Sequence, residues 1–292
     1  MTPLEQYKEL AEKIGVPNLY FKREDLHKYG SHKGRSIPFM IEYYYKKGDR
    51  KFAISSSGNA ALAGAKYAIE FNSKNEDKIF LDIFVGANIN EHKLQNLKQL
   101  ESENSTNIRV LIKERPLQAL NQAITEGYRS LRQSTDDVAL SGYISLAQEL
   151  SKQTKLGAVF IGTSSGTTAQ ALAQYFIENK IQAQVHIIQT SSCHPIADQF
   201  ENYDGPQDKS IADAIVAQTT ERMPKLVTLI NQTGGFAWVS SNDDIRQAKE
   251  LVSKYAHINI SNNSALSVSG LIQSIYRDWK IDGDIVCLIC GE

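Results

Sequence analysis

A lysine and two polar loops supply the side chains with which this chain could do chemistry. Lys33 comes shortly after an apolar run, residues 19–21, where Ser31 could cap a helix that continues through residues 37–40. In the first turn of that helix, beside Arg35, the helix dipole and the guanidinium would favour the neutral, nucleophilic form of the lysine amine. The alternative interpretation is an ordinary solvated lysine in a basic loop.

The first polar loop, which we call the serine loop, is rich in hydroxyl groups and precedes an alanine-rich stretch. It consists of Ser55, Ser56, Ser57, Gly58 and Asn59. Hydroxyls and backbone N–H groups at the positive end of a helix suit a carboxylate ligand. The alternative is simple N-capping of the helix by Ser57 or Asn59, which needs only one such residue.

The second polar loop, which we call the threonine loop, spans residues 162–168 with the sequence GTSSGTT. Its Thr163, Ser164, Ser165, Gly166 and Thr167 form an anion cradle by composition. It lacks the lysine of a P-loop and the glycine spacing of a dinucleotide-binding motif, so it favours a small phosphate that is held and not transferred. A nucleotide-binding α/β protein, or a hydroxyl-rich loop without a ligand, is the alternative.

Cys290 ends the last apolar run of the chain. Ligands of open α/β sheets bind beyond the carboxyl ends of the strands, which is where Cys290 would lie. Cys287 precedes it by three positions, and residues so spaced on a strand point to opposite faces. This spacing disfavours a shared metal ion or a disulfide bond, and a buried inert thiol is the alternative role for Cys290.

Short apolar runs alternate with amphipathic segments, which predicts βαβ units and therefore an α/β fold. We expect two lobes, each a mainly parallel sheet covered by helices, with the boundary near residues 140–143. The smaller lobe would be residues 36–142 and the larger lobe residues 1–35 and 143–292. The expected strands are residues 51–54, 79–85, 108–112, 158–161, 185–188, 236–239 and 285–290. The expected helices are residues 60–70, 94–100, 117–131, 168–178, 245–255 and 265–279.

Composition excludes several classes of partner. The chain of 292 residues has 32 Lys and Arg against 33 Asp and Glu, a net charge of -1, so no overall field recruits nucleic acid or an anionic membrane surface. No apolar run is long enough to span a bilayer, and the N-terminus lacks the apolar core of a signal peptide. With only three cysteines, this predicts a cytoplasmic protein that acts on a small molecule.

The order of these motifs resembles that of the fold-type II pyridoxal-phosphate enzymes, the tryptophan synthase β-like family. This family includes threonine synthase, cysteine synthase, serine/threonine dehydratases and D-cysteine desulfhydrase. Residues 22–26 followed by residues 30–33 are similar to the lysine segment of the family. The pattern Ser31-x-Lys33-x-Arg35 is similar to its threonine and cysteine synthase branches, and residues 56–61 resemble the threonine synthase form of the second motif.

The resemblance implies a pyridoxal 5'-phosphate site between the two lobes. It implies that Lys33 forms the Schiff base and moves the α-proton, that Asn59 bonds the ring hydroxyl, and that the threonine loop holds the phosphate. Cys290 would lie beside the pyridine nitrogen. The remaining members of the serine loop would bind the substrate carboxylate: Ser55, Ser56, Ser57 and Gly58.

The resemblance also implies β-elimination or β-replacement on an amino acid by a threonine synthase-like lyase that forms a homodimer. A cysteine synthase-like or serine/threonine dehydratase-like enzyme is an alternative. A second alternative is a non-catalytic protein that binds the cofactor. It is suggested by Thr163 and Ser165, where relatives usually have glycine, and by residues 261–265, which lack the glutamate of many relatives.

Overall fold

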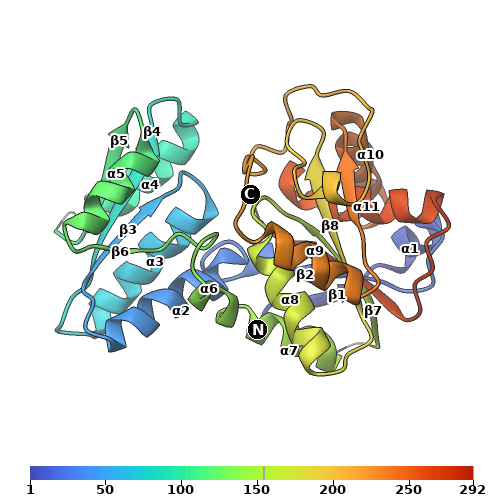
Figure 1. The fold of residues 1–292 in the computed structure, drawn as a ribbon, viewed down its shortest axis with the longest axis horizontal. Helices are drawn as coiled ribbons and strands as arrows, with labels where there is room; N and C mark the ends of the chain where they lie inside the picture. The colour runs from blue at the N-terminus through green and yellow to red at the C-terminus, as the bar shows by residue number, and fades with distance from the viewer. Residues whose placement is uncertain (105, 154, 292) are drawn as a thin grey trace. The chain divides into compact units, whose positions relative to one another are not determined.

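A computed structural model describes residues 1–104, 106–153 and 155–291. The chain forms two compact units (Figure 1). Unit 1 consists of Met1–His27 and Tyr143–Glu292, and unit 2 consists of Lys28–Gly142. Lys33 therefore belongs to unit 2, whereas the division expected from the sequence assigned it to the other lobe.

Unit 2 is built on a four-stranded parallel sheet with the strand order β5-β4-β3-β6. Its strands are β3 (Lys51–Ser55), β4 (Phe80–Gly86), β5 (Ile108–Lys113) and β6 (Arg129–Ser130). Its helices are α2 (Lys33–Lys46), α3 (Asn59–Lys74), α4 (Glu91–Glu103), α5 (Pro116–Thr125) and α6 (Val138–Ser141).

The alternation of side chains along β3 explains how the helices cover this sheet. Phe52 and Ile54 point to one face and pack in the core shared with α2, α3 and α4, whereas Ala53 points to the other face and packs against α5. The short helix α6 is tied to α2 because the Ser36 hydroxyl donates to the Ala139 carbonyl at 2.8 Å. This contact holds the end of unit 2 against its first helix.

Unit 1 is built on a six-stranded sheet with the order β1-β2-β10-β7-β8-β9, in which only the β1–β2 pair is antiparallel. Its strands are β1 (Leu4–Gln6), β2 (Leu19–Arg23), β7 (Leu156–Gly162), β8 (Gln184–Thr190), β9 (Ala237–Ser240) and β10 (Asp284–Ile289). Its α-helices are α1 (Lys8–Ile14), α7 (Ile144–Gln153), α8 (Thr167–Glu178), α9 (Met223–Gln232), α10 (Asn242–Tyr255) and α11 (Asn262–Tyr276). Two short 3-10 helices complete it, η1 (Glu24–Leu26) and η2 (Ala197–Gln199).

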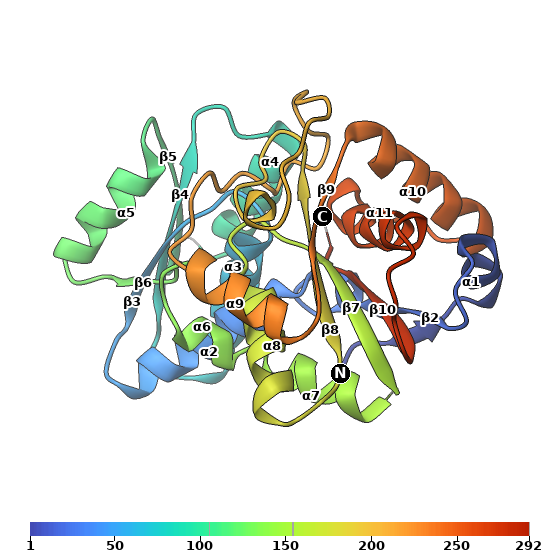
Figure 2. The same cartoon turned by 45° about the vertical axis from the view of Figure 1, so that its right-hand side comes forward.

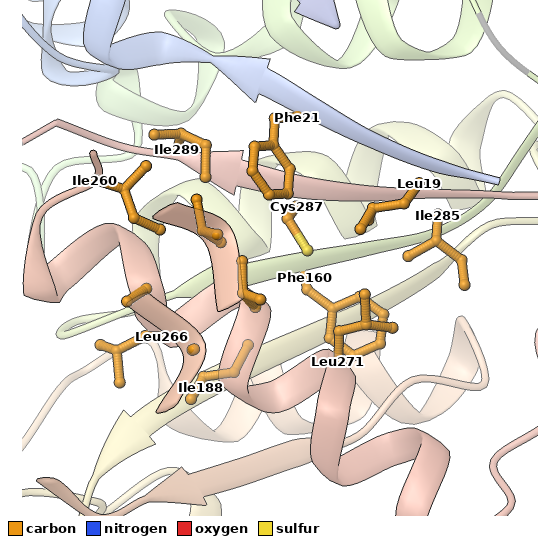
Figure 3. Close-up of a cluster of buried hydrophobic side chains, with 14 of the residues drawn as sticks. Leu19, Phe21, Phe160, Ile188, Ile260, Leu266, Leu271, Ile285, Cys287 and Ile289 are labelled. Atoms are coloured by element: carbon orange, nitrogen blue, oxygen red, sulfur yellow. The ribbon is translucent and has the colours of Figure 1, made fainter. Parts of the chain in front are cut away.

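Helices cover both faces of the unit 1 sheet. In Figure 2, α7, α8 and α9 lie on one side, and α1, α10 and α11 lie on the other. Figure 3 shows the core on the second side, where Phe21, Phe160, Cys287 and Leu271 meet in one apolar cluster. Because both faces are buried, the central strands are almost continuously apolar, as in other parallel sheets.

The predicted fold class is confirmed, since both sheets are mainly parallel and covered by helices. Several details differ from the prediction, including the following two. Leu131 does not belong to α5, which ends at Thr125; it follows the short strand β6 and lies buried in the core of unit 2. The N-terminal segment forms a strand, β1, ahead of its helix. In the described ranges, no helix is both long enough and apolar enough to cross a membrane.

Candidate functional site

Lys33 is the first residue of α2, as the sequence predicted. Its side chain is half-buried, and its amine takes part in no hydrogen bond or ion pair within the described part of the chain. The amine is thus free to react with an electrophile.

The turn before Lys33 differs from the prediction that Ser31 caps the helix. His32 is the N-cap residue, and no side chain makes a capping hydrogen bond to α2. Ser31 is fully buried, and its hydroxyl lacks a hydrogen-bond partner within the described residues. A buried hydroxyl without a partner is costly in free energy and marks a place where a polar ligand could be accepted.

The serine loop connects β3 to α3 in unit 2. Its Gly58 is the N-cap residue of α3, and no side chain caps this helix either, so the interpretation as capping by Ser57 or Asn59 is wrong. Gly58 N–H donates to the Ser56 hydroxyl at 3.3 Å. The side chains of Ser57 and Asn59 have no partner in the described residues. The loop therefore presents unused donors at a helix N-terminus, which suits a carboxylate.

The threonine loop connects β7 to α8 in unit 1. Gly166 is the N-cap residue of α8 and has φ 81°, a left-handed conformation that glycine adopts most easily. A Cβ atom at Gly166 would lie 2.2 Å from Leu226 Cδ2. The Thr163 hydroxyl accepts from Gly166 N–H at 3.1 Å, and the hydroxyls of Ser165 and Thr167 lie 3.1 Å apart. The loop is thus a tight turn whose N–H groups stand at the start of a helix, an arrangement typical of anion sites.

Cys290 follows β10, the strand next to β7 in the sheet. Because the two strands are parallel, Cys290 and the threonine loop lie at the same edge of the unit 1 sheet. Cys290 is buried, with 6% of its surface exposed. The start of α11 is attached here, since the Ser261 hydroxyl donates to the Gly291 carbonyl at 2.7 Å. The structure therefore groups Cys290, the threonine loop and the start of α11.

The sequence reasoning missed a segment that packs on the threonine loop. Residues Ser210–Thr220, which we call the strap, have no helix or strand, yet side chains from two other elements bind their backbone. The sequence feature that could have indicated these contacts is the pair Asn262 and Asn263, because an amide side chain can both donate to and accept from loop backbone.

This chain is similar in sequence to known proteins. A family model described as "Pyridoxal-phosphate dependent enzyme" matches residues 1–291. Threonine synthase of Methanocaldococcus jannaschii is 24% identical, and the match covers 100% of this chain and 74% of that protein. Threonine synthase of Methanosarcina acetivorans is 22% identical with the same coverage.

Solved structures share the fold. A pyridoxal 5'-phosphate-dependent aspartate racemase has a TM-score of 0.83 at 19% identity, with 99% of this chain and 89% of that chain covered. Threonine deaminase isoform 2 from Solanum lycopersicum has a TM-score of 0.80 at 19% identity, with 99% and 83% covered. Maize serine racemase has a TM-score of 0.82 at 16% identity, with 99% and 87% covered.

Proposed function

Because this chain belongs to the family of pyridoxal-phosphate-dependent enzymes, we propose that it catalyses a β-elimination or β-replacement on an amino acid, as a threonine synthase-like lyase. Its cofactor is pyridoxal 5'-phosphate. Bound to the protein, this cofactor supplies an electron sink for the bonds at the α-carbon of an amino acid. The residues that would bind the cofactor and the substrate come from the loops described above.

The threonine loop fits a phosphate monoester. Backbone N–H groups at the uncapped start of α8 would bind the phosphate oxygens, and the left-handed Gly166 would give them a tight turn. In unit 2, the unpartnered amine of Lys33 fits the reactive carbonyl carbon of the cofactor. The free Asn59 amide could donate to the ring hydroxyl, and the buried Ser31 hydroxyl is a further donor near the lysine.

The remaining side chains would act on the amino acid. Ser55, Ser56, Ser57 and Gly58 would hold its carboxylate at the start of α3 and so fix the orientation of its α-carbon. Once displaced by the substrate, the Lys33 amine would take the α-proton on Nζ and return it later in the reaction. A half-buried position would limit competition from water for this proton.

Cys290 is the observation that favours elimination and replacement within this family. A cysteine beside the ring nitrogen lacks the carboxylate charge that would stabilise a proton on that nitrogen. The Cys290 thiol donates to the Leu288 carbonyl at 3.7 Å. A ring without that proton withdraws electrons less strongly, which suits reactions whose leaving group departs soon after the α-proton.

The first test is cofactor binding. The full chain supplied with pyridoxal phosphate should develop visible absorbance, and Lys33→Ala should abolish this absorbance and reduce turnover by at least about 10³-fold. Lys28→Ala is the matched control, because Lys28 lies in the same segment but pairs with Glu70 at 3.0 Å. Equal absorbance in the Lys33→Ala protein would refute the assignment of this lysine.

The second test identifies the reaction. The loaded protein is titrated with phosphohomoserine, threonine, serine and acetylserine, and absorbance and released products are followed. Turnover of phosphohomoserine supports the threonine synthase-like activity, whereas acetylserine or serine turnover would instead assign a cysteine synthase-like or dehydratase-like enzyme. Cofactor binding without a spectral response to any amino acid would identify a protein that binds the cofactor without catalysis.

A further inference from the structure

We propose that Ser164, Asn262 and Asn263 are positioning residues that tie the strap to the threonine loop and to the start of α11. They would hold the backbone N–H groups of the threonine loop ready for the cofactor phosphate. This proposal rests on the proposed function for its ligand. The ties themselves are contacts within unit 1.

Ser164 joins the threonine loop to the strap. Its hydroxyl oxygen accepts from the N–H groups of Val216 and Ala217, each at 3.1 Å. In the same region, the Thr220 hydroxyl donates to the Ser165 carbonyl at 2.9 Å. Two accepted bonds use both lone pairs of the Ser164 oxygen. The strap therefore fixes the position of that oxygen, and the O–H hydrogen and the backbone N–H of Ser164 stay available as donors.

The opposite side of Ser164 is fixed by Gln189, a fully buried residue of β8. The Gln189 amide donates to the Ser164 carbonyl at 3.3 Å, and its oxygen accepts from the N–H groups of Ile196 and Ala197 at 2.8 and 3.0 Å. Ser164 is thus held through its side chain and through its backbone. Such double fixation reduces the conformational entropy that the loop would lose on binding a ligand.

Asn262 and Asn263 hold the same strap from α11. The Asn263 oxygen accepts from Ala214 N–H at 3.0 Å, and its amide nitrogen donates to an Asp213 carboxylate oxygen at 3.1 Å. The Asn262 amide donates to the Ile211 carbonyl at 3.0 Å. Five strap residues are therefore bound by Ser164 or by the asparagine pair: Ile211, Asp213, Ala214, Val216 and Ala217.

The start of α11 also contacts the threonine loop directly. A Cβ atom at Gly162 would lie 2.9 Å from the Asn263 carbonyl oxygen and 3.0 Å from Leu266 Cβ. The adjacent Ser261 holds the Gly291 carbonyl, next to Cys290. Asn263 consequently touches both the strap and the threonine loop, and a change at this residue should be felt by both.

Hydrogen exchange in the full chain without cofactor tests the ties. Ser164→Ala should raise the exchange rate of the Val216 and Ala217 amides by roughly tenfold, and Ser164→Thr should restore protection because it keeps the hydroxyl. Asn263→Ala should do the same for the Ala214 amide. Ser151→Ala is the control, since its exposed hydroxyl contacts only its own helix. Unchanged exchange in both variants would overturn the proposal.

Equilibrium titration with pyridoxal phosphate tests the positioning role. Both variants should bind the cofactor roughly tenfold more weakly than wild type, and Ser151→Ala should bind as wild type does. Faster exchange with unchanged affinity would show that the strap is tied but does not position the loop, and would overturn the proposal. If wild type itself binds no pyridoxal phosphate, the proposed function fails, while the exchange result still decides whether the ties exist.

Discussion

His186 is a buried imidazole held by aromatic neighbours in unit 1. Trp238 Nε1 donates to His186 Nδ1 at 3.2 Å, and His186 Nε2 lies 2.9 Å from the Gln184 amide oxygen. The ring of Phe160 stacks on the imidazole with a centroid distance of 4.4 Å. Because burial disfavours the charged form, it lowers the pKa of His186 to about 3. The folded chain therefore keeps this side chain neutral.

This histidine should make stability depend on pH. Between the ordinary pKa of 6.5 and about 3, the unfolded chain binds a proton that the folded chain does not. Stability from this group is therefore full above pH 6.5 and falls as the pH drops, by about 2 kcal/mol at pH 5. Urea unfolding at pH 7 and pH 5 should show a smaller loss for His186→Gln than for wild type. The exposed His92→Gln should behave as wild type, and an equal loss in all three proteins would contradict this assignment.

At the residue scale, the sequence predicted which side chains belong to the candidate site better than it predicted their hydrogen-bond partners. Lys33 could be placed in the first turn of α2 because helix periodicity and the preceding turn both indicate it. The sequence could not exclude Ser31 as the N-cap residue of α2. The N-cap position depends on backbone angles and can move by one residue, here to His32. The use of the Ser164 hydroxyl could not be predicted, because its partner Val216 is 52 positions away.

At the scale of elements, the threonine loop depends on Gly166 in two ways. Its positive φ favours glycine, and the space for a Cβ atom is already filled by Leu226. Gly127 also has a positive φ, 89°, but no atom lies within 4 Å of its missing Cβ. A side chain at Gly127 would therefore meet backbone strain alone, whereas one at Gly166 would meet both backbone strain and steric overlap.

Alanine substitutions at these two glycines should differ. Gly127→Ala should cost about 1 kcal/mol of unfolding free energy from strain alone. Gly166→Ala should cost about 2 to 4 kcal/mol, because the overlap with Leu226 is added, and it should also weaken binding of the cofactor. Urea unfolding measures both costs. A loss at Gly166 no larger than that at Gly127 would show that the loop yields to the methyl group.

Most elements were predictable from hydrophobic periodicity, and the errors have physical causes. Long segments such as α8 and β4 match their predicted ranges within a few residues. Leu131 was assigned to a helix because it continues an apolar spacing, although a glycine at 127 ends that helix. The strap has no periodicity at all, so only side-chain contacts formed in the folded state define it.

At the scale of the whole molecule, unit 1 is assembled from two separate parts of the chain. Lys22 on β2 helps to join them: its amine donates to Glu149 Oε2 at 2.6 Å and to the Thr2 carbonyl at 2.7 Å. The Lys22 side chain is fully buried, and Glu149 is 15% exposed. A buried ion pair of this kind is costly to break from one side, because the remaining charge loses its countercharge.

Lys22→Met should therefore destabilise the protein by about 3 kcal/mol, measured by urea unfolding. The double variant Lys22→Met/Glu149→Leu should recover part of this loss, since it also removes the carboxylate that has lost its countercharge. If the single variant is as stable as wild type, or the double variant is less stable than the single one, the pair does not join the two segments as described.

The two-lobed α/β architecture was predictable from the alternation of strands and helices, and the comparisons confirm the family. The exact start of unit 2 was not predictable. Helix α2, which begins at Lys33, belongs to unit 2 because it packs on α3, and no local feature of the sequence indicates this. The homodimer and the cytoplasmic location implied by the sequence stay predictions.

The strand order of unit 1 has a consequence for synthesis on the ribosome. β10, the last strand to be made, lies between β2, which is made near the start, and β7. Unit 2 is continuous and complete once Gly142 has emerged, so it can fold while translation continues. The β1–β2 pair must wait until residue 289 has been made before the parallel partner of β2 exists. Because such distant pairing closes a very long loop, we expect the sheet of unit 1 to form late and slowly, with the edge of β2 open to chaperones until then.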